Sequence, residues 1–112
     1  MSITATIDEP INQDEESFDI PVCTEKLLRE VILPAANTLN LTLFQQLDSF
    51  IEIDEDNMSK FASELGKLVE YINVDKALTE IQARHLVERL MFLQDNLRSL
   101  FDKRSSVTVT IG

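Results

Sequence analysis

Apolar residues recur every three or four positions between residues 79 and 104, and this spacing predicts one long amphipathic helix. Thr79 is followed three residues later by Gln82, a pattern typical of a capping box, so we place the helix start at Thr79. The rest of the fold is expected to pack on its apolar face, which consists of Ala83, Leu86, Val87, Leu90, Leu93, Leu97, Leu100 and Phe101.

A second stretch, from about Asn57 to Asn73, shows the same helical spacing. Because only residues 73–78 connect it to the first helix, we expect the two helices to form an antiparallel hairpin at the heart of the core. The apolar face of this second helix consists of Met58, Phe61, Ala62, Leu65, Leu68, Val69 and Ile72.

Two apolar residues of the first helix, Ile81 and Phe92, fall on the side opposite its core face, near His85 and Arg89. One interpretation is a central helix whose second side meets another segment of the same chain. The other is a surface for a partner or for a second copy, because an exposed aromatic ring beside an arginine is typical of interface anchors. Both interpretations stay open at this point.

The two ends of the chain alternate between polar and apolar residues, which predicts half-buried strands at residues 2–7 and 105–111. A lone strand leaves its backbone groups unpaired, so the simplest arrangement pairs the two ends into an antiparallel ribbon laid on the helices. The alternative is that a terminal strand adds to a sheet of another chain.

The segment between residues 8 and 21 carries six acids and no base, with proline near both ends, and is expected to be an acidic loop or flexible segment. Further on, Thr24 is a plausible N-cap for a helix that Pro34 would end or kink at Leu33.

Residues 39–43 alternate as a strand would, but Asn40 can also serve as the N-cap of a helix. We adopt the helix, because it places five apolar side chains on one face: Leu43, Phe44, Leu47, Phe50 and Ile51.

The pattern as a whole predicts a mainly α, α+β fold. Three to four helices would pack around the helical hairpin, and the short N- and C-terminal strands would form a small antiparallel ribbon. The chain of 112 residues with 44% hydrophobic residues is expected to be a single domain, residues 1–112, and its two glycines and three prolines disfavour an all-β fold with many turns.

Charge is distributed unevenly along the chain. Residues 1–56 contain 13 acidic and two basic residues, a net charge of −11, whereas residues 57–112 contain seven acidic and eight basic residues, a net charge of +1. A field of this sign repels nucleic acids and anionic membranes, and it favours encounter with basic proteins. We therefore expect a basic protein partner, and neither nucleic acid nor membrane.

A cytoplasmic location is expected from three features of the chain. No apolar run approaches the roughly 18 residues needed to span a bilayer, and the N-terminus lacks the basic start and apolar centre of a signal peptide. The single cysteine, Cys23, excludes an internal disulfide and fits a reducing compartment.

Candidate chemistry is sparse, and we expect no catalytic residue, cofactor or metal. With two glycines in the chain, a glycine-rich phosphate loop cannot form. Cys23 and His85 are the only residues of their types, so a zinc site would lack its usual ligands. Counting Asp54 as the first position of a calcium-binding loop places Met58 and Leu65 where oxygen ligands belong.

These observations favour a small acidic interaction protein, not an enzyme, that binds a basic protein and inhibits or chaperones it, as an immunity protein, antitoxin or adaptor does. The alternatives are a self-associating homodimeric subunit with no catalytic role and an enzyme that uses carboxylates. Ile81, His85, Arg89 and Phe92 are the candidate anchor residues. The acids expected to steer the partner are Asp14, Glu15, Glu16, Asp48, Glu52, Asp54, Glu55 and Asp56.

Overall fold

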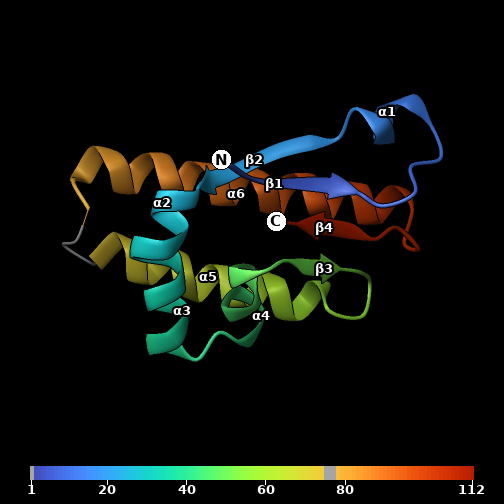
Figure 1. Cartoon of the computed structure of the whole chain (residues 1–112). Coiled ribbons are helices and arrows are strands. Elements are labelled where there is room, and N and C mark those ends of the chain that lie inside the picture. Colours follow the sequence, from blue (N-terminus) through green and yellow to red (C-terminus); the bar gives the residue numbers. More distant parts are fainter. Residues whose placement is uncertain (1, 75–77) are drawn as a thin grey trace.

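The computed structural model describes residues 2–74 and 78–112, and these residues form a sheet of four antiparallel strands backed by helices (Figure 1). The order across the sheet is β2-β1-β4-β3, so the two strands from the chain ends lie side by side at its centre. The predicted pairing of the terminal strands is therefore confirmed, as the middle of a larger sheet. The strands are β1 (Ser2–Ile7), β2 (Asp19–Thr24), β3 (Ile51–Ile53) and β4 (Val109–Ile111).

Both terminal strands have a neighbour on each side. Strand β1 pairs with β2 and β4, and β4 pairs with β1 and β3. The alternative in which a terminal strand adds to another chain is therefore wrong, since neither has a free edge within the described sheet. The edges belong instead to β2 and β3, the two strands that were not predicted.

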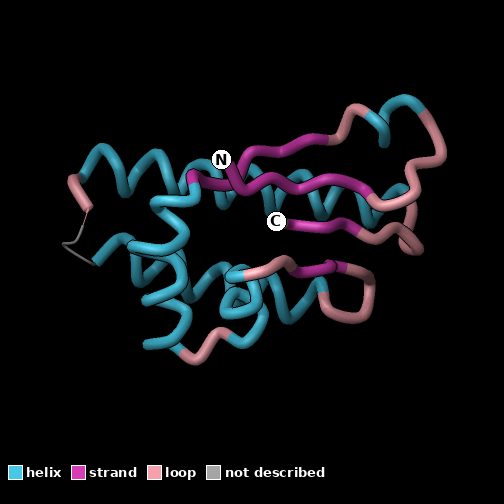
Figure 2. Tube along the Cα trace, in the orientation of Figure 1, coloured by secondary structure: helices cyan, strands magenta, loops and turns pink. Residues whose placement is uncertain are grey.

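Two long helices, α5 (Met58–Val74) and α6 (Glu80–Lys103), lie side by side on one face of the sheet and run in opposite directions (Figures 1 and 2). Both predicted helices are confirmed, and so is the capping box. The Thr79 hydroxyl accepts a hydrogen bond from the backbone N–H of Gln82, and the Gln82 side chain accepts one from the backbone N–H of Thr79, each 3.2 Å long. Of the predicted connection, residues 75–77 lie outside the described residues.

The core lies between this helix pair and the inner face of the sheet. The inner face is built from alternate strand residues that are all buried: Ala5, Ile7, Ile51, Ile53, Val109 and Ile111. The predicted core residues of α6 that are buried are Leu86, Leu90, Leu93, Leu97 and Leu100. The other three, Ala83, Val87 and Phe101, are partly buried against the core.

Short helices complete the fold: α1 (Gln13–Glu16), α2 (Glu25–Leu27), η1 (Leu28–Ile32), α3 (Leu33–Leu39), α4 (Thr42–Gln45) and η2 (Gln46–Asp48). Thr24 is the N-cap of α2, as predicted, and its hydroxyl accepts from the backbone N–H of Leu27 at 3.2 Å.

Of the two outcomes predicted at Pro34, an end or a kink of the helix, the end is wrong, because the chain continues as α3 to Leu39. Proline has no N–H to donate, and inside an α-helix its ring crowds the carbonyl four residues earlier. Directly before it, η1 is a π-helical turn in which the N–H of Leu33 donates to the carbonyl of Leu28, five residues back. The wider turn leaves Pro34 at the start of α3, where a proline is tolerated.

Residues 8–21, expected to be an acidic loop, contain α1 and the first half of β2. The helix predicted for residues 40–51 is shorter than expected. Asn40 has a left-handed backbone (φ 56°) and ends α3 rather than starting a helix. Leu43, Phe44 and Leu47 are buried as predicted, but Phe50 is exposed and Ile51 lies in β3.

The N-terminus of α4 is capped by a residue from α5 instead of by Asn40. The buried carboxylate of Glu64 accepts hydrogen bonds from the backbone N–H groups of Leu43 at 3.0 Å and Phe44 at 3.3 Å. Its second oxygen accepts from the Thr42 hydroxyl at 3.4 Å. A carboxylate at this position satisfies otherwise unpaired N–H groups and complements the positive end of the helix.

Candidate partner-binding surfaces

The outer face of the sheet carries a row of polar side chains that crosses all four strands. The strand register places Glu52 opposite Thr110, Thr110 opposite Thr6, and Thr6 opposite Asp19. The carboxylates of Glu52 and Asp19 thus stand at the two edges, with two threonine hydroxyls between them. In the described part of the chain, no helix packs on this face (Figures 1 and 2). An antiparallel sheet with one face on the core and one toward water is a common arrangement.

A further acid, Asp8, lies directly after β1 on the same face. Its backbone N–H donates to the carbonyl of Thr108 at 2.9 Å, and its carboxylate accepts from the Thr110 hydroxyl at 2.7 Å. None of the four described strands contains Lys or Arg. Within the four described strands, the acids of the outer face are therefore not balanced by a basic residue.

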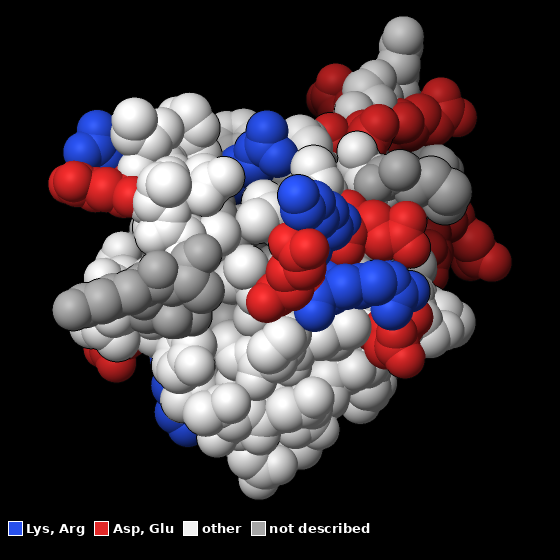
Figure 3. All heavy atoms as spheres, turned by 60° about the vertical axis from the view of Figure 1, so that its left-hand side comes forward, with Lys and Arg blue, Asp and Glu red and all other residues white. Residues whose placement is uncertain are grey.

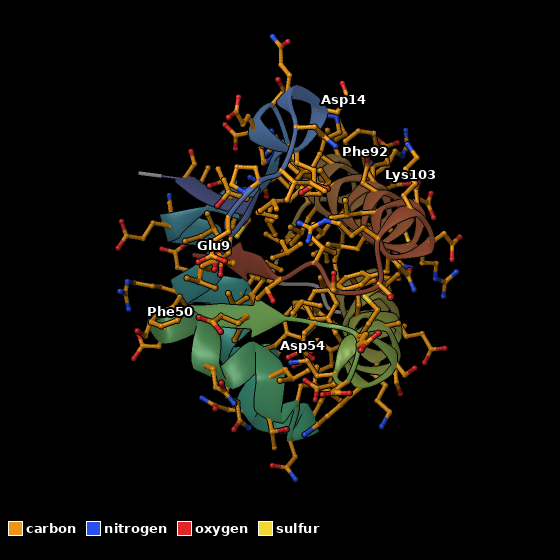
Figure 4. The ribbon with its side chains drawn as sticks, turned by 90° about the vertical axis from the view of Figure 1, so that its right-hand side faces the viewer. Glu9, Asp14, Phe50, Asp54, Phe92 and Lys103 are labelled. Atoms are coloured by element: carbon orange, nitrogen blue, oxygen red, sulfur yellow. The ribbon has the colours of Figure 1, made fainter. Side chains whose placement is uncertain are left out.

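The loops at one end of the sheet extend this acidic region. Figure 4 views that end and shows Glu9, Asp14 and Asp54 in three separate segments around it. Between the segments lies a recess of about 620 Å³, whose lining includes Asp8, Glu9, Glu52 and Arg104. We use the name acidic surface for the acids of the sheet face and of this end: Asp8, Glu9, Asp14, Glu16, Asp19, Glu52, Asp54, Glu55 and Asp56.

Hydrogen bonds fix the turn that carries Asp54. Its carboxylate accepts from the backbone N–H groups of Asp56 at 2.9 Å and Asn57 at 3.1 Å. The Asn57 side-chain amide in turn donates to the carbonyl of Glu52 at 2.8 Å and accepts from the N–H of Asp54 at 2.9 Å. This amide pairs with the edge of β3 as a neighbouring strand would, so that part of the edge is occupied.

One predicted steering acid, Glu15, has a different position from its neighbours. It is buried, and its two carboxylate oxygens accept from Arg104 at 2.9 Å and 2.6 Å. The hydrogen bond from Arg104 is the main cause that lowers the pKa of Glu15. Glu15 therefore holds α1 against the end of α6, while Asp14 and Glu16 remain exposed.

Another predicted steering acid, Asp48, is paired with a basic residue of the same chain. It forms an ion pair of 3.0 Å with Arg29, which also lies 3.5 Å from Glu25. Figure 3 shows a face of the molecule on which Lys and Arg lie next to Asp and Glu and a broad area is uncharged. The structure places the segments of Asp14 and Asp54 at one end of the sheet, with Glu16, Glu52, Glu55 and Asp56 in the same segments (Figure 4). Glu15 and Asp48 differ from these acids because each is paired with an arginine.

The predicted anchor residues all lie on the solvent side of α6. Ile81 is 65% exposed and Phe92 is 55% exposed, so the interpretation in which they meet another segment of the same chain is wrong. His85 and Arg89 are exposed beside them. Together with Pro21 and Glu88, the residues His85, Arg89 and Phe92 line a recess of about 350 Å³ between α6 and the edge strand β2.

Cys23 and His85, the residues with the most reactive side chains, differ in their exposure to solvent. Cys23 is buried in β2, and burial raises the pKa of its thiol to about 11, with a smaller opposing effect of the Arg89 charge. His85 is on the surface. Among residues 2–74 and 78–112, no group of three or more His, Cys, Asp or Glu side chains could hold a metal ion.

Three acids of the acidic surface, Asp8, Glu9 and Asp19, were not among the residues singled out by the sequence.

In the described residues no helix is both long and apolar enough to cross a bilayer. Comparison of the chain with known protein families, characterised proteins and solved structures found no match. The inference of function therefore rests on two features of the structure, the acidic surface and the exposed side of α6 around Phe92.

Proposed function

We propose that the protein binds a basic protein partner through the acidic surface. The observation that carries the proposal is the row from Glu52 through Thr110 and Thr6 to Asp19, with Asp8 beside it, on a sheet face without Lys or Arg. Neighbouring strands lie about 4.8 Å apart, so the backbones of the two edge residues, Asp19 and Glu52, are roughly 14 Å apart. Lysine or arginine side chains of a partner can extend between them and donate to the threonine hydroxyls.

Electrostatic attraction would act mainly on the rate of encounter. Like charges that gather on one face produce a field that steers a basic protein toward that face, and the effect weakens as salt is added. The recess near the end of the sheet is lined by three carboxylates, those of Asp8, Glu9 and Glu52, and by Arg104, whose guanidinium is paired with Glu15. The three carboxylates are available to a cation of the partner. Such binding would neutralise or shield a basic partner, as an immunity or antitoxin-like inhibitor, a chaperone or an adaptor does.

The proposal also places this binding in the cytoplasm, where the single thiol of Cys23 stays reduced. Nucleic acids and anionic membranes are disfavoured as partners, because the acidic surface repels both.

The test compares a surface variant with a matched control of equal charge. Asp19→Asn with Glu52→Gln removes two charges from the row, and Glu30→Gln with Glu70→Gln removes two exposed charges elsewhere. Each protein is immobilised and exposed at low salt to a lysate of the source organism, and bound proteins are released by a salt step. The proposal predicts one basic protein that the wild type and the control retain and the surface variant loses. Equal retention by both variants would contradict it.

A further inference from the structure

The face of α6 that points away from the core has an exposed aromatic ring and, directly before it along the helix, a recess. Phe92 is 55% exposed, and the recess of about 350 Å³ is lined by His85, Glu88 and Arg89, one to two turns before Phe92, and by Pro21 of β2. A projecting ring and a recess on the same face are complementary in shape, as the side chains that interlock between packed helices are. They cannot satisfy each other within one molecule, because Phe92 itself forms one wall of the recess.

We propose that two copies of the protein associate through α6, with Phe92 of each copy in the recess of the other. The recess precedes Phe92 along the helix, so a reciprocal exchange requires the two helices to run antiparallel. A two-fold axis relates the copies in such an interface, and residue i of one copy meets residue j of the other at two equivalent places.

This register places favourable pairs around each ring. Arg89 lies beside the Phe92 ring of the partner, where its guanidinium can contact the aromatic face. Asp95, one turn after Phe92, comes opposite His85 of the other copy. Asp95 and Arg89 are both exposed, and neither forms an ion pair within residues 2–74 and 78–112. Association of two copies therefore gives the charged side chains of Arg89 and Asp95 interactions that they do not make in the described part of the single chain.

Charge favours a second copy over other occupants of this face. Helix α6 contains four acidic and four basic residues, so it is neutral within a chain of net charge −10. Two copies can therefore approach through α6 without the repulsion that their acidic surfaces would produce. The outer face of the sheet lies on the opposite side of the sheet from α6, so its acids Asp8 and Glu52 stay free in both copies (Figures 1 and 2). Asp14 of the acidic surface, in contrast, lies beside Asn96 and Lys103 of α6.

Sedimentation velocity over a range from low micromolar to high micromolar concentration tests the association. We expect the wild-type protein to form a dimer in this range. Phe92→Ala should raise the dissociation constant of the dimer at least tenfold and so shift the protein to monomer. The matched control is Phe50→Ala, which removes a ring of similar exposure, 52%, from a different part of the surface. A monomeric wild type throughout this range, or a dimer that persists unchanged in Phe92→Ala, would overturn the proposal.

A charge exchange tests the antiparallel register separately from the contact itself. Asp95→Lys places a cation opposite His85 and Arg89 of the other copy, so it should weaken the dimer at both equivalent places. Adding His85→Asp to Asp95→Lys places an anion opposite the new lysine and should restore association. If Asp95→Lys does not weaken the dimer, or if the double variant is no tighter than the single one, the register is wrong.

Discussion

The side chains of Glu15 and Arg104, which are 89 positions apart in the sequence, form a two-bond ion pair that ties α1 to the end of α6. The Glu15 carboxylate also accepts a hydrogen bond from the backbone N–H of Ile11 at 3.3 Å. Asn12 is the N-cap of α1, and its side-chain oxygen accepts from the backbone N–H of Glu15 at 2.8 Å. Through these contacts an acid-rich segment is held in one conformation. Asp14 and Glu16 are thereby kept at the end of the sheet, beside the other acids of the acidic surface.

This ion pair predicts a specific dependence of stability on pH. The pKa of Glu15 is lower in the folded protein than its ordinary value of 4.5, so the pair stabilises the fold above that value, and the stabilisation is lost as the pH falls through the lowered pKa. Glu15→Gln lacks this contribution at every pH. Urea unfolding should show the variant less stable than the wild type at pH 7, with a smaller difference at pH 3. A difference that is the same at both pH values would contradict this assignment.

The buried carboxylate of Glu64 caps α4, so its removal is predicted to lower the free energy of unfolding of the protein. Replacing Glu64 by Ala leaves the N–H groups of Leu43 and Phe44 without an acceptor in a buried position. Such a loss costs about 1–3 kcal/mol. The control is Glu70→Ala, an exposed position on the same helix, where a change within about 0.5 kcal/mol is expected. Chemical denaturation measures both, and equal effects at the two positions would show that Glu64 does not cap α4.

The amide of Asn57 predicts an effect on solubility. Asn57→Ala removes the group that pairs with the carbonyl of Glu52 and the N–H of Asp54, and so opens an edge of the sheet to other chains. Light scattering at increasing protein concentration should show aggregation of the variant before that of the wild type. Asn73→Ala, an exposed asparagine of α5, is the control. If both variants remain as soluble as the wild type, the amide does not protect the edge.

Because the thiol of Cys23 is buried, we predict that thiol reagents modify it slowly in the folded protein. With its pKa raised to about 11, the thiolate is scarce at pH 8. Relative to a free cysteine of pKa about 8.5, the thiolate fraction falls roughly 200-fold, and burial slows access further. A disulfide reagent should therefore react slowly with the folded protein and rapidly in denaturant. Rapid reaction of the folded protein would contradict the burial of the Cys23 thiol.

The two long helices and the terminal strands could be predicted because each carries its own periodic signal. The capping residues Thr79 and Gln82 are close in sequence, so their contact needs no tertiary information. Strand β3 has only three residues, and Ile51 fits a helical face as well as a strand. Strand β2 contains Pro21, which is tolerated because the strand lies at an edge.

The sequence predicted that an acidic surface exists, but it did not predict correctly which acids belong to it. Glu52 was recognised because acids gather around it in the sequence. Asp8 and Asp19 join it only through strand register, which pairs Thr6 with Asp19 and brings Asp8 next to Thr110. Conversely, Glu15 has acidic neighbours on both sides, but its carboxylate is taken by a distant arginine. Pairings of this range depend on the complete fold.

The most direct test of the acidic surface is the association rate with the captured basic partner, measured by stopped flow at low and at high salt. The wild type and the control, Glu30→Gln with Glu70→Gln, should associate quickly at low salt and lose most of that advantage at high salt. Asp19→Asn with Glu52→Gln should associate several-fold more slowly at low salt and match the others at high salt. Identical rates for all three proteins at low salt would contradict the claim that this surface receives the partner.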